Sequence, residues 1–248
     1  ILSIVAVVVF ASFVHLWPYR MTFSLRHYAF DVQNGIQPLW NSIYVSVMAA
    51  GIGVLAVTAA SYVIEKFPSP ATRALYFLSI LPAAVPGMVL GLGYILAFNN
   101  PVNPVYAIYG TLFIIALANV YYYHAHGFLI SGTSIKQISG RFDEASATLG
   151  GSRRQTFTKV TLPLLFPTLV GIAVFFFMRS MVTLSAVIFL ITPNTQVAAV
   201  SVLYLQDRGA TNQAAAFSVC IIAIIMAVLL LARLLLNALG FRNVSLIR

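Results

Sequence analysis

The chain has 248 residues, of which 60% are hydrophobic and 8% are charged. Soluble domains carry about 25% charged residues, so this composition excludes a water-soluble globule. Fourteen Lys and Arg residues against five Asp and Glu residues give a formal net charge of +9. In so apolar a chain this excess indicates basic cytoplasmic loops rather than nucleic-acid binding. Cys220 is the single cysteine, which excludes an internal disulfide and a cysteine metal cluster.

Six apolar stretches are each long enough for a membrane-crossing helix, which needs about 20 residues. Backbone polar groups must be satisfied internally in lipid, so these stretches predict an all-α polytopic membrane protein with six transmembrane helices and one domain over residues 1–248. Residue 1 is Ile, and the first stretch lacks the basic region of a signal peptide, so we expect the chain to begin inside a longer one. The six stretches are residues 1–17, 39–64, 75–97, 109–131, 164–191 and 213–236.

Basic side chains fall mainly on one side of these spans. The opposite side holds Arg20, Arg26 and Arg208. By the positive-inside rule, the richer side is cytoplasmic and so are both ends of the segment. The residues on that side are Lys66, Arg73, Lys136, Arg141, Arg153, Arg154, Lys159, Arg233, Arg242 and Arg248.

The third span is interrupted by proline and glycine. Pro82 and Pro86 lie within it, and Gly87 and Gly91 follow with the spacing that lets two helices approach closely. We expect this helix to be kinked, and we favour helix packing over a pore-lining role for its glycines. The polar segment 192–212 encloses an apolar run that predicts a short helix on the outer surface.

The long cytoplasmic loop 132–163 predicts two helices joined by a tight turn. Apolar residues from Ile135 to Leu149 recur three and four apart, as on one face of a helix. Gly150 and Gly151 end that helix, and Ser152 with Gln155 matches a capping box that opens another. We expect the second helix to end near Thr161, before Pro163. The alternative is a solvated loop whose charges only set the topology.

The same loop resembles the EAA loop of binding-protein-dependent ABC importer permeases of type I. The family pattern is E-A-A-x3-G-x9-I-x-L-P, and Glu144, Ala145, Gly150, Leu162 and Pro163 match it in type and spacing. Two positions depart from the pattern, since Ser146 replaces the second Ala and Val160 replaces Ile. Both changes are small, so the resemblance is little affected.

The resemblance implies that this loop is the coupling helix, which sits in a cleft of a cytoplasmic ATP-binding subunit. It implies a bacterial inner-membrane complex with two such subunits, a second permease half in the same or another chain, an extracytoplasmic solute-binding protein and surrounding lipid. ATP and Mg would be held by the partner ATPase, and this chain would bind no cofactor, metal or nucleic acid and would not itself be an enzyme. The implied coupling residues are Asp143, Glu144, Ala145, Ser146, Gly150, Arg153, Arg154, Leu162 and Pro163.

Residues 177–190, followed by 195–198, resemble the permeases for ferric iron or for phosphonates such as 2-aminoethylphosphonate. These often carry two six-span halves on one chain. The resemblance implies ferric iron or a small phosphonate or phosphate-type anion as the solute.

Arg179 is the charge inside the fifth span, and a charge there is costly unless it faces water, a partner or a substrate. One interpretation is that it attracts an anionic solute in the translocation pathway, with Ser180, Thr183 and Ser185 beside it. The other is a structural bond to carbonyls or to a second permease half. His124 and His126 lie two apart on a predicted helix and therefore point away from each other, so we expect packing or interfacial roles for them rather than a shared metal.

Two other classes of protein remain as alternatives. An ion- or proton-driven secondary transporter usually has acidic groups at mid-membrane, and none lies in a span core here. An intramembrane enzyme would need a motif such as GxSxG or HExxH, and the sequence contains neither.

Overall fold

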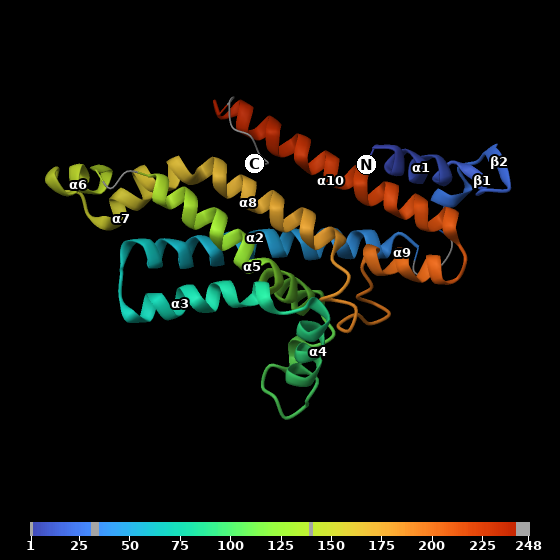
Figure 1. The fold of residues 1–248 in the computed structure, drawn as a ribbon, viewed down its shortest axis with the longest axis horizontal. Coiled ribbons are helices and arrows are strands. Elements are labelled where there is room, and N and C mark those ends of the chain that lie inside the picture. Colours follow the sequence, from blue (N-terminus) through green and yellow to red (C-terminus); the bar gives the residue numbers. More distant parts are fainter. Residues whose placement is uncertain (1, 31–34, 139–140, 242–248) are drawn as a thin grey trace.

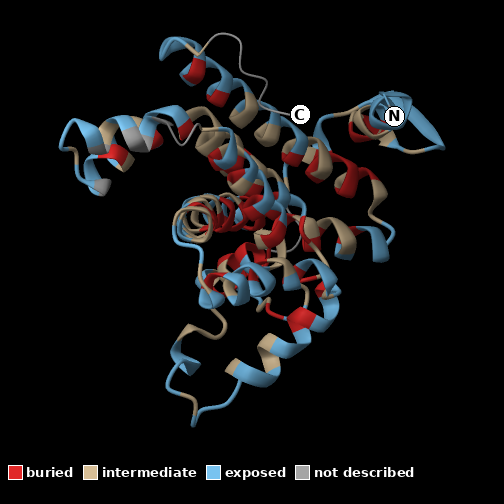
Figure 2. Ribbon diagram, turned by 60° about the vertical axis from the view of Figure 1, so that its left-hand side comes forward, coloured by how far each residue is buried: buried red, intermediate tan, exposed pale blue. Residues whose placement is uncertain are grey.

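Three long helices form the centre of the computed structural model of the chain, which describes residues 2–30, 35–138 and 141–241. They are α2 (Gln37–Lys66), α5 (Leu112–Gln137) and α8 (Leu162–Val182). The molecule is elongated, and these helices run side by side along its length (Figure 1). Buried residues gather along this packed centre, whereas the projecting elements are largely exposed (Figure 2).

The ring of Phe176 on α8 is the innermost contact between the three helices. Its side chain is fully buried. A Cβ atom placed on Gly53 of α2 would lie 2.7 Å from the ring, and one on Gly127 of α5 would lie 2.8 Å from it. The ring therefore occupies space that only glycine leaves free on both neighbours, in keeping with the small residues that let membrane helices approach.

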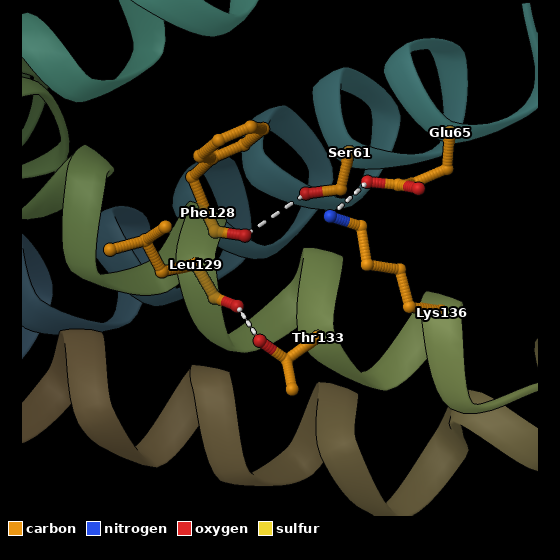
Figure 3. Close-up of polar contacts among 6 residues, drawn as sticks. All are labelled: Ser61, Glu65, Phe128, Leu129, Thr133 and Lys136. Atoms are coloured by element: carbon orange, nitrogen blue, oxygen red, sulfur yellow. Dashed lines mark hydrogen bonds and ion pairs between the residues drawn. The ribbon is translucent and has the colours of Figure 1, made fainter.

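Polar contacts join α2 to α5 beyond this packed centre. Ser61 Oγ donates to the carbonyl of Phe128 at 3.2 Å, and Lys136 Nζ lies 3.2 Å from Glu65 Oε1 near the ends of the two helices (Figure 3). The Lys136 side chain is 63% exposed, so the ion pair contributes at most about 1 kcal/mol. Apolar packing rather than this pair holds the two helices together.

The expected count of six spans is not confirmed. Within the described residues, four helices are long and apolar enough to cross a membrane, or five if one sharply bent pair is a single span. The four are α2, α5, the continuous helix Arg154–Val182 that contains α8, and α10 (Thr211–Ala238).

The bent pair lies where the third span was expected, so the predicted kink is confirmed. Helix α3 (Pro70–Ile80) continues into a 3-10 turn, Leu81–Ala84, and α4 (Gly87–Phe98) leaves it at 110°. Two of the three glycines of α4, Gly87 and Gly91, are close-packing positions as expected, although they meet the non-helical segment after α8 rather than another helix. A Cβ on Gly87 would collide with Ser185, and one on Gly91 would lie 2.9 Å from the Ala186 carbonyl oxygen.

The expected first span, residues 1–17, is wrong in the described residues. Helix α1 (Leu2–Ser12) is followed by strand β1 (Val14–Leu16), which pairs antiparallel with β2 (Arg20–Phe23). The cause is a distant residue, the buried Asn212 in the first turn of α10, which donates to the Ala11 and Val14 carbonyls at 2.8 and 3.0 Å and accepts from Trp17 N at 3.1 Å. These bonds satisfy the backbone groups that are left free where α1 ends. Because they come from a residue far away in the sequence, the all-α prediction did not include this small hairpin.

The remaining elements flank this framework. The short helix predicted within 192–212 is present as α9 (Ala198–Asp207), whose first backbone N–H donates to Ser42 Oγ of α2 at 2.8 Å. Two 3-10 turns, Arg26–Tyr28 and Tyr106–Ile108, lie in the connections. Helices α6 (Arg141–Thr148) and α7 (Arg153–Thr156) project at one end of the molecule, and the hairpin lies at the other (Figure 1).

Gly53, one of the two glycines that contact the Phe176 ring, is expected to be essential for helix packing. Gly53→Ala should destabilise the protein by roughly 1–3 kcal/mol, because the added methyl group overpacks a ring that is enclosed on both sides. Gly51→Ala on the same helix is the matched control, since nothing lies within 4 Å of its Cβ position. Alanine there should be neutral or stabilising by up to about 1 kcal/mol. Apparent unfolding temperatures in one detergent test this, and equal shifts for both variants would contradict the packing argument.

Candidate functional site

The segment from α6 to α7 forms a tight helical elbow, as the sequence predicts. Gly150 has φ +74°, and the Gly151 N–H donates to the Ser146 carbonyl at 2.8 Å, which is the bond of a Schellman motif. Ser152 N donates to Gln155 Oε1 at 2.8 Å, and Gln155 N donates to Ser152 Oγ at 3.3 Å. This reciprocal pair is the predicted capping box.

Ser146, one of the predicted coupling residues, joins the two helices of the elbow. Its Oγ lies 2.6 Å from Thr156 Oγ1, so a hydroxyl pair bridges α6 and α7. A Cβ on Gly151 would lie 2.9 Å from the Ser146 carbonyl oxygen, which explains a second glycine at the turn. Ser146 replaces the alanine of the family pattern and gains this bond.

The elbow exposes apolar side chains away from the bundle. Leu149 is 87% exposed and Phe142 is 49% exposed, and Ala145 on the same helix is also exposed. The expected single helix from Ile135 to Leu149 is wrong, because α5 ends at Gln137 and Ile135 is buried with the bundle. The exposed apolar residues of the elbow therefore belong to a segment separate from α5.

The predicted end of the second helix near Thr161 is also wrong. Helix α7 passes through a π-helical turn, Phe157–Thr161, directly into α8, and Pro163 lies in the first turn of α8. The Leu162 N–H donates to the Phe157 carbonyl, five residues back. This wider turn moves the preceding carbonyls away from the proline ring, so a helix can continue where a strict α-helix would clash.

The other coupling residues expected from the sequence are placed as follows. The side chain of Arg154 is exposed, and Leu162 and Pro163 are exposed at the start of α8. The backbones of Asp143, Glu144 and Arg153 are helical, and their side chains lie outside the described part of the structure. The expected basic tail with Arg242 and Arg248 also lies outside the described residues.

A second candidate site is a cavity of about 450 Å³ at the break between α3 and α4. Its walls come from the break, from the middle of α5 and from the last turns of α8. Its lining residues are Pro82, Ala83, Ala84, Val85, Pro86, Tyr122, Tyr123, His126, Phe175 and Arg179. The helix break therefore makes room for a polar cavity inside the span region.

Arg179 lines this cavity and contacts aromatic rings. Its guanidinium carbon lies 5.9 Å from the Tyr123 ring centroid and 5.7 Å from that of Phe175. Such contacts are worth about 0.5–2 kcal/mol each. Among the described side chains, no carboxylate lies within ion-pair distance of Arg179.

The hydroxyl residues expected beside Arg179 do not line the cavity. Ser180 is buried and accepts from Asn119 Nδ2 at 2.7 Å. Thr183 Oγ1 donates to the Arg179 carbonyl at 2.6 Å and lies 2.9 Å from the Tyr123 hydroxyl. Ser185 packs against the Gly87 backbone. These residues hold the end of α8 and orient Tyr123, whereas Arg179 alone of the four faces the cavity.

Tyr122, Tyr123 and His126 are the cavity residues that sequence reasoning missed. The argument that two histidines two apart point in different directions agrees with the structure, because the His124 ring stacks on Phe128 while His126 lines the cavity. The sequence offered one signal for these three cavity residues, because they lie on the predicted helix that follows the span broken by two prolines. Within the described residues, no group of three or more His, Cys, Asp or Glu side chains is arranged to hold a metal ion.

A family model described as "Binding-protein-dependent transport system inner membrane component" matches residues 51–243 of the chain. This range includes the elbow and the cavity, and excludes the hairpin.

Curated relatives are transport permeases. The ferric transport system permease protein FbpB of Actinobacillus pleuropneumoniae is 33% identical over 89% of this chain and 32% of its own length. A putative 2-aminoethylphosphonate transport system permease protein, PhnV of Salmonella paratyphi A, is 26% identical over 88% of this chain and 82% of its own length. The chain thus spans about a third of the first relative and most of the second.

The fold matches that of solved ABC transporter chains. A bacterial ABC transporter involved in import of the acidic polysaccharide alginate aligns with a TM-score of 0.77 at 17% identity, covering 98% of this chain and 91% of that one. The alginate transporter in complex with its oligosaccharide-bound periplasmic protein aligns with a TM-score of 0.72 over 88% and 83% of the two chains, also at 17% identity. At this identity the match concerns the fold.

Proposed function

Because the chain belongs to the family of binding-protein-dependent transport system inner membrane components, we propose that it forms half of the solute pathway of an ATP-driven importer. The other parts are a second permease half, two cytoplasmic ATP-binding subunits that hold ATP and Mg, and an extracytoplasmic solute-binding protein. The names of the relatives support ferric iron or a small phosphonate or phosphate-type anion as the solute.

The exposed elbow is the observation that carries this proposal. Its helices project beyond the bundle (Figure 1), and they carry an exposed leucine and an exposed phenylalanine. Exposed apolar groups at a membrane protein's aqueous end indicate a partner. We assign that partner as the ATP-binding subunit, with Glu144, Ala145 and Gly150 at the contact and with Asp143, Arg153 and Arg154 around it.

The distribution of charge supports a cytoplasmic position for the elbow. The segments rich in Lys and Arg, which include the end of α2 and the start of α3, gather at the same end of the molecule as the elbow (Figure 1). The hairpin and the end of α9, which carry Arg20, Arg26 and Arg208, lie at the opposite end. The positive-inside rule then favours a cytoplasmic position for the elbow. The expectation that both termini lie on that side rested on a first span that α1, with 11 residues, does not form.

Bulk at the elbow should uncouple the transporter. Gly150→Trp is expected to reduce co-purification of the ATP-binding subunit and solute import at least tenfold, because the indole fills the docking surface. Glu144→Lys should act in the same direction by reversing a charge at that surface. Co-purification and uptake into proteoliposomes measure the two effects.

Gly209→Trp is the matched control. Gly209 has φ +75° and nothing within 4 Å of its Cβ position, as Gly150 does, but it lies at the end of α9. Both variants carry the same left-handed backbone strain of about 1 kcal/mol, so co-purification should be lost only for Gly150→Trp. Equal loss in both variants would show that strain, not docking, is responsible.

Arg179 is assigned to the solute pathway, because it lines the cavity at the helix break and has no carboxylate partner among the described side chains. Ser180, Thr183 and Ser185 shape the end of α8 around it. The Tyr123 and Phe175 rings hold the Arg179 guanidinium in place but do not cancel its positive charge.

Replacement of Arg179 should slow transport without affecting assembly. Arg179→Gln is expected to lower the import rate about tenfold or more, since a charge-assisted contact to an anionic solute is worth about 1.5–3 kcal/mol. Arg179→Lys should retain part of the rate because it keeps the charge. The comparison is import rate against yield of the assembled complex. A parallel fall in both quantities for Arg179→Gln would identify the arginine as a structural anchor instead.

A further inference from the structure

We propose that the cavity at the α3–α4 break is a binding site for an oxyanion group of the solute, with Arg179, His126 and Tyr122 as its hydrogen-bond donors. This inference rests on the proposed function and narrows its substrate class. A phosphonate or phosphate ester fits the site, whereas ferric iron would enter it only as a complex with an anionic ligand.

The three proposed donors come from two helices that line the same cavity. Arg179 is on the last turn of α8, and Tyr122 and His126 are four residues apart in the middle of α5. Positions four apart share one helix face. The guanidinium, the imidazole and the phenol are thus presented to one space from adjacent walls.

The two tyrosines of the cavity have different roles. The Tyr123 hydroxyl lies 2.9 Å from Thr183 Oγ1, and its ring lies beside the Arg179 guanidinium, so it supports the arginine. Tyr122 packs edge-on against Tyr123, with ring centroids 4.8 Å apart, and its hydroxyl has no hydrogen-bond partner among the described residues. A phenol that lines the same cavity as a guanidinium is suited, with it, to binding an oxygen acceptor.

His126 completes this donor set from an exposed position. Its ring lies 6.2 Å from the Phe175 ring, the same ring that Arg179 approaches, and it has no hydrogen-bond partner among the described residues. An imidazole offers at least one N–H donor in either tautomer. The histidine and the arginine are therefore placed around a shared aromatic wall.

The described charges near the cavity favour an anion over a bare metal cation as its ligand. Of the acidic side chains that the structure describes, Glu65 is paired with Lys136 and Asp207 lies at the end of α9, and neither lines the cavity. Hard cations such as ferric iron are bound by oxygen anions, and here the charged group is a guanidinium. The site therefore attracts the opposite charge.

A helix terminus adds to this preference. Helix α4 begins at Gly87, directly after Pro86 in the cavity wall, so the positive end of its dipole lies beside the cavity. A volume of about 450 Å³ accommodates a small solute, and the cavity is not fully enclosed, which favours weak binding and release.

Binding is best tested on the permease–ATPase complex in nanodiscs, without nucleotide and without the solute-binding protein, which would itself bind the probe. The probes are methylphosphonate and methylammonium, two small ions of opposite charge that each carry one methyl group, detected by saturation-transfer NMR of their methyl protons. Methylphosphonate should bind and methylammonium should not. Arg179→Gln and His126→Gln should each weaken methylphosphonate binding about tenfold, and Tyr122→Phe should weaken it less.

Neighbouring residues provide matched controls. His124→Gln and Tyr121→Phe change the same chemical groups on other faces of α5, where His124 stacks on Phe128, and they should leave binding unchanged. Binding is compared only between variants whose unfolding temperature equals that of the unmodified protein. If Arg179→Gln fails to assemble, Arg179→Lys takes its place and should retain partial binding. Unchanged methylphosphonate binding in both Arg179→Gln and His126→Gln would overturn the proposal.

Lipid headgroups are a second source of phosphate, so the measurement is made in phosphatidylcholine nanodiscs and in discs that contain phosphatidylglycerol. Binding that persists in both supports a solute site, and binding abolished by phosphatidylglycerol would assign the cavity to a lipid headgroup and overturn the proposal. ATP-dependent uptake is measured separately. Uptake without methylphosphonate binding contradicts only this inference, whereas failure to assemble with an ATP-binding subunit contradicts the proposed function.

Discussion

The packing of one aromatic ring between two glycines determines how the central helices meet. In lipid the helices gain nothing from the hydrophobic effect on association, so close van der Waals contact has to hold them. The Phe176 ring supplies it against Gly53 and Gly127. Its neighbours face other directions, because successive helical residues rotate by about 100°: Phe175 lines the cavity, and Phe177 is buried in the cluster with α9 and α10. One contact therefore fixes the rotation of α8 and, with it, the direction of Arg179.

The continuity of α8 connects the two candidate sites. The helix runs from Arg154 in the elbow to Val182 beside the cavity, a length of roughly 40 Å. The π-helical turn before Pro163 preserves this continuity, and Tyr62 of α2 packs against Phe157 in that turn, with ring centroids 4.7 Å apart. The proposed coupling thus has a rigid element, because a tilt of the elbow displaces the same helix that carries Arg179.

Local signals predicted much of the elbow but little of the cavity. The glycine turn, the capping box and the proline break depend on neighbouring residues, and the resemblance read from the EAA pattern is confirmed by the family match. The hairpin was missed because the backbone at the end of α1 bonds to Asn212, which lies 201 residues beyond Ala11. Pro163 was misread because a wider helical turn relieves the clash that the prediction assumed. His126 and Tyr122 were passed over because their meaning depends on which helix face meets the α3–α4 break, and sequence periodicity does not give that rotation.

An ion-driven secondary transporter would place its coupling ion on acidic groups near mid-membrane. The described spans instead bring a guanidinium, an imidazole and phenols to the helix break, and Glu65 is paired at a helix end. A positively charged site can attract an anion but gives a proton or sodium ion no carboxylate to bind. In the proposed assembly, the energy for uptake comes from another subunit. The exposed apolar elbow at the end of the same helix is a surface through which an ATP-binding partner would supply it.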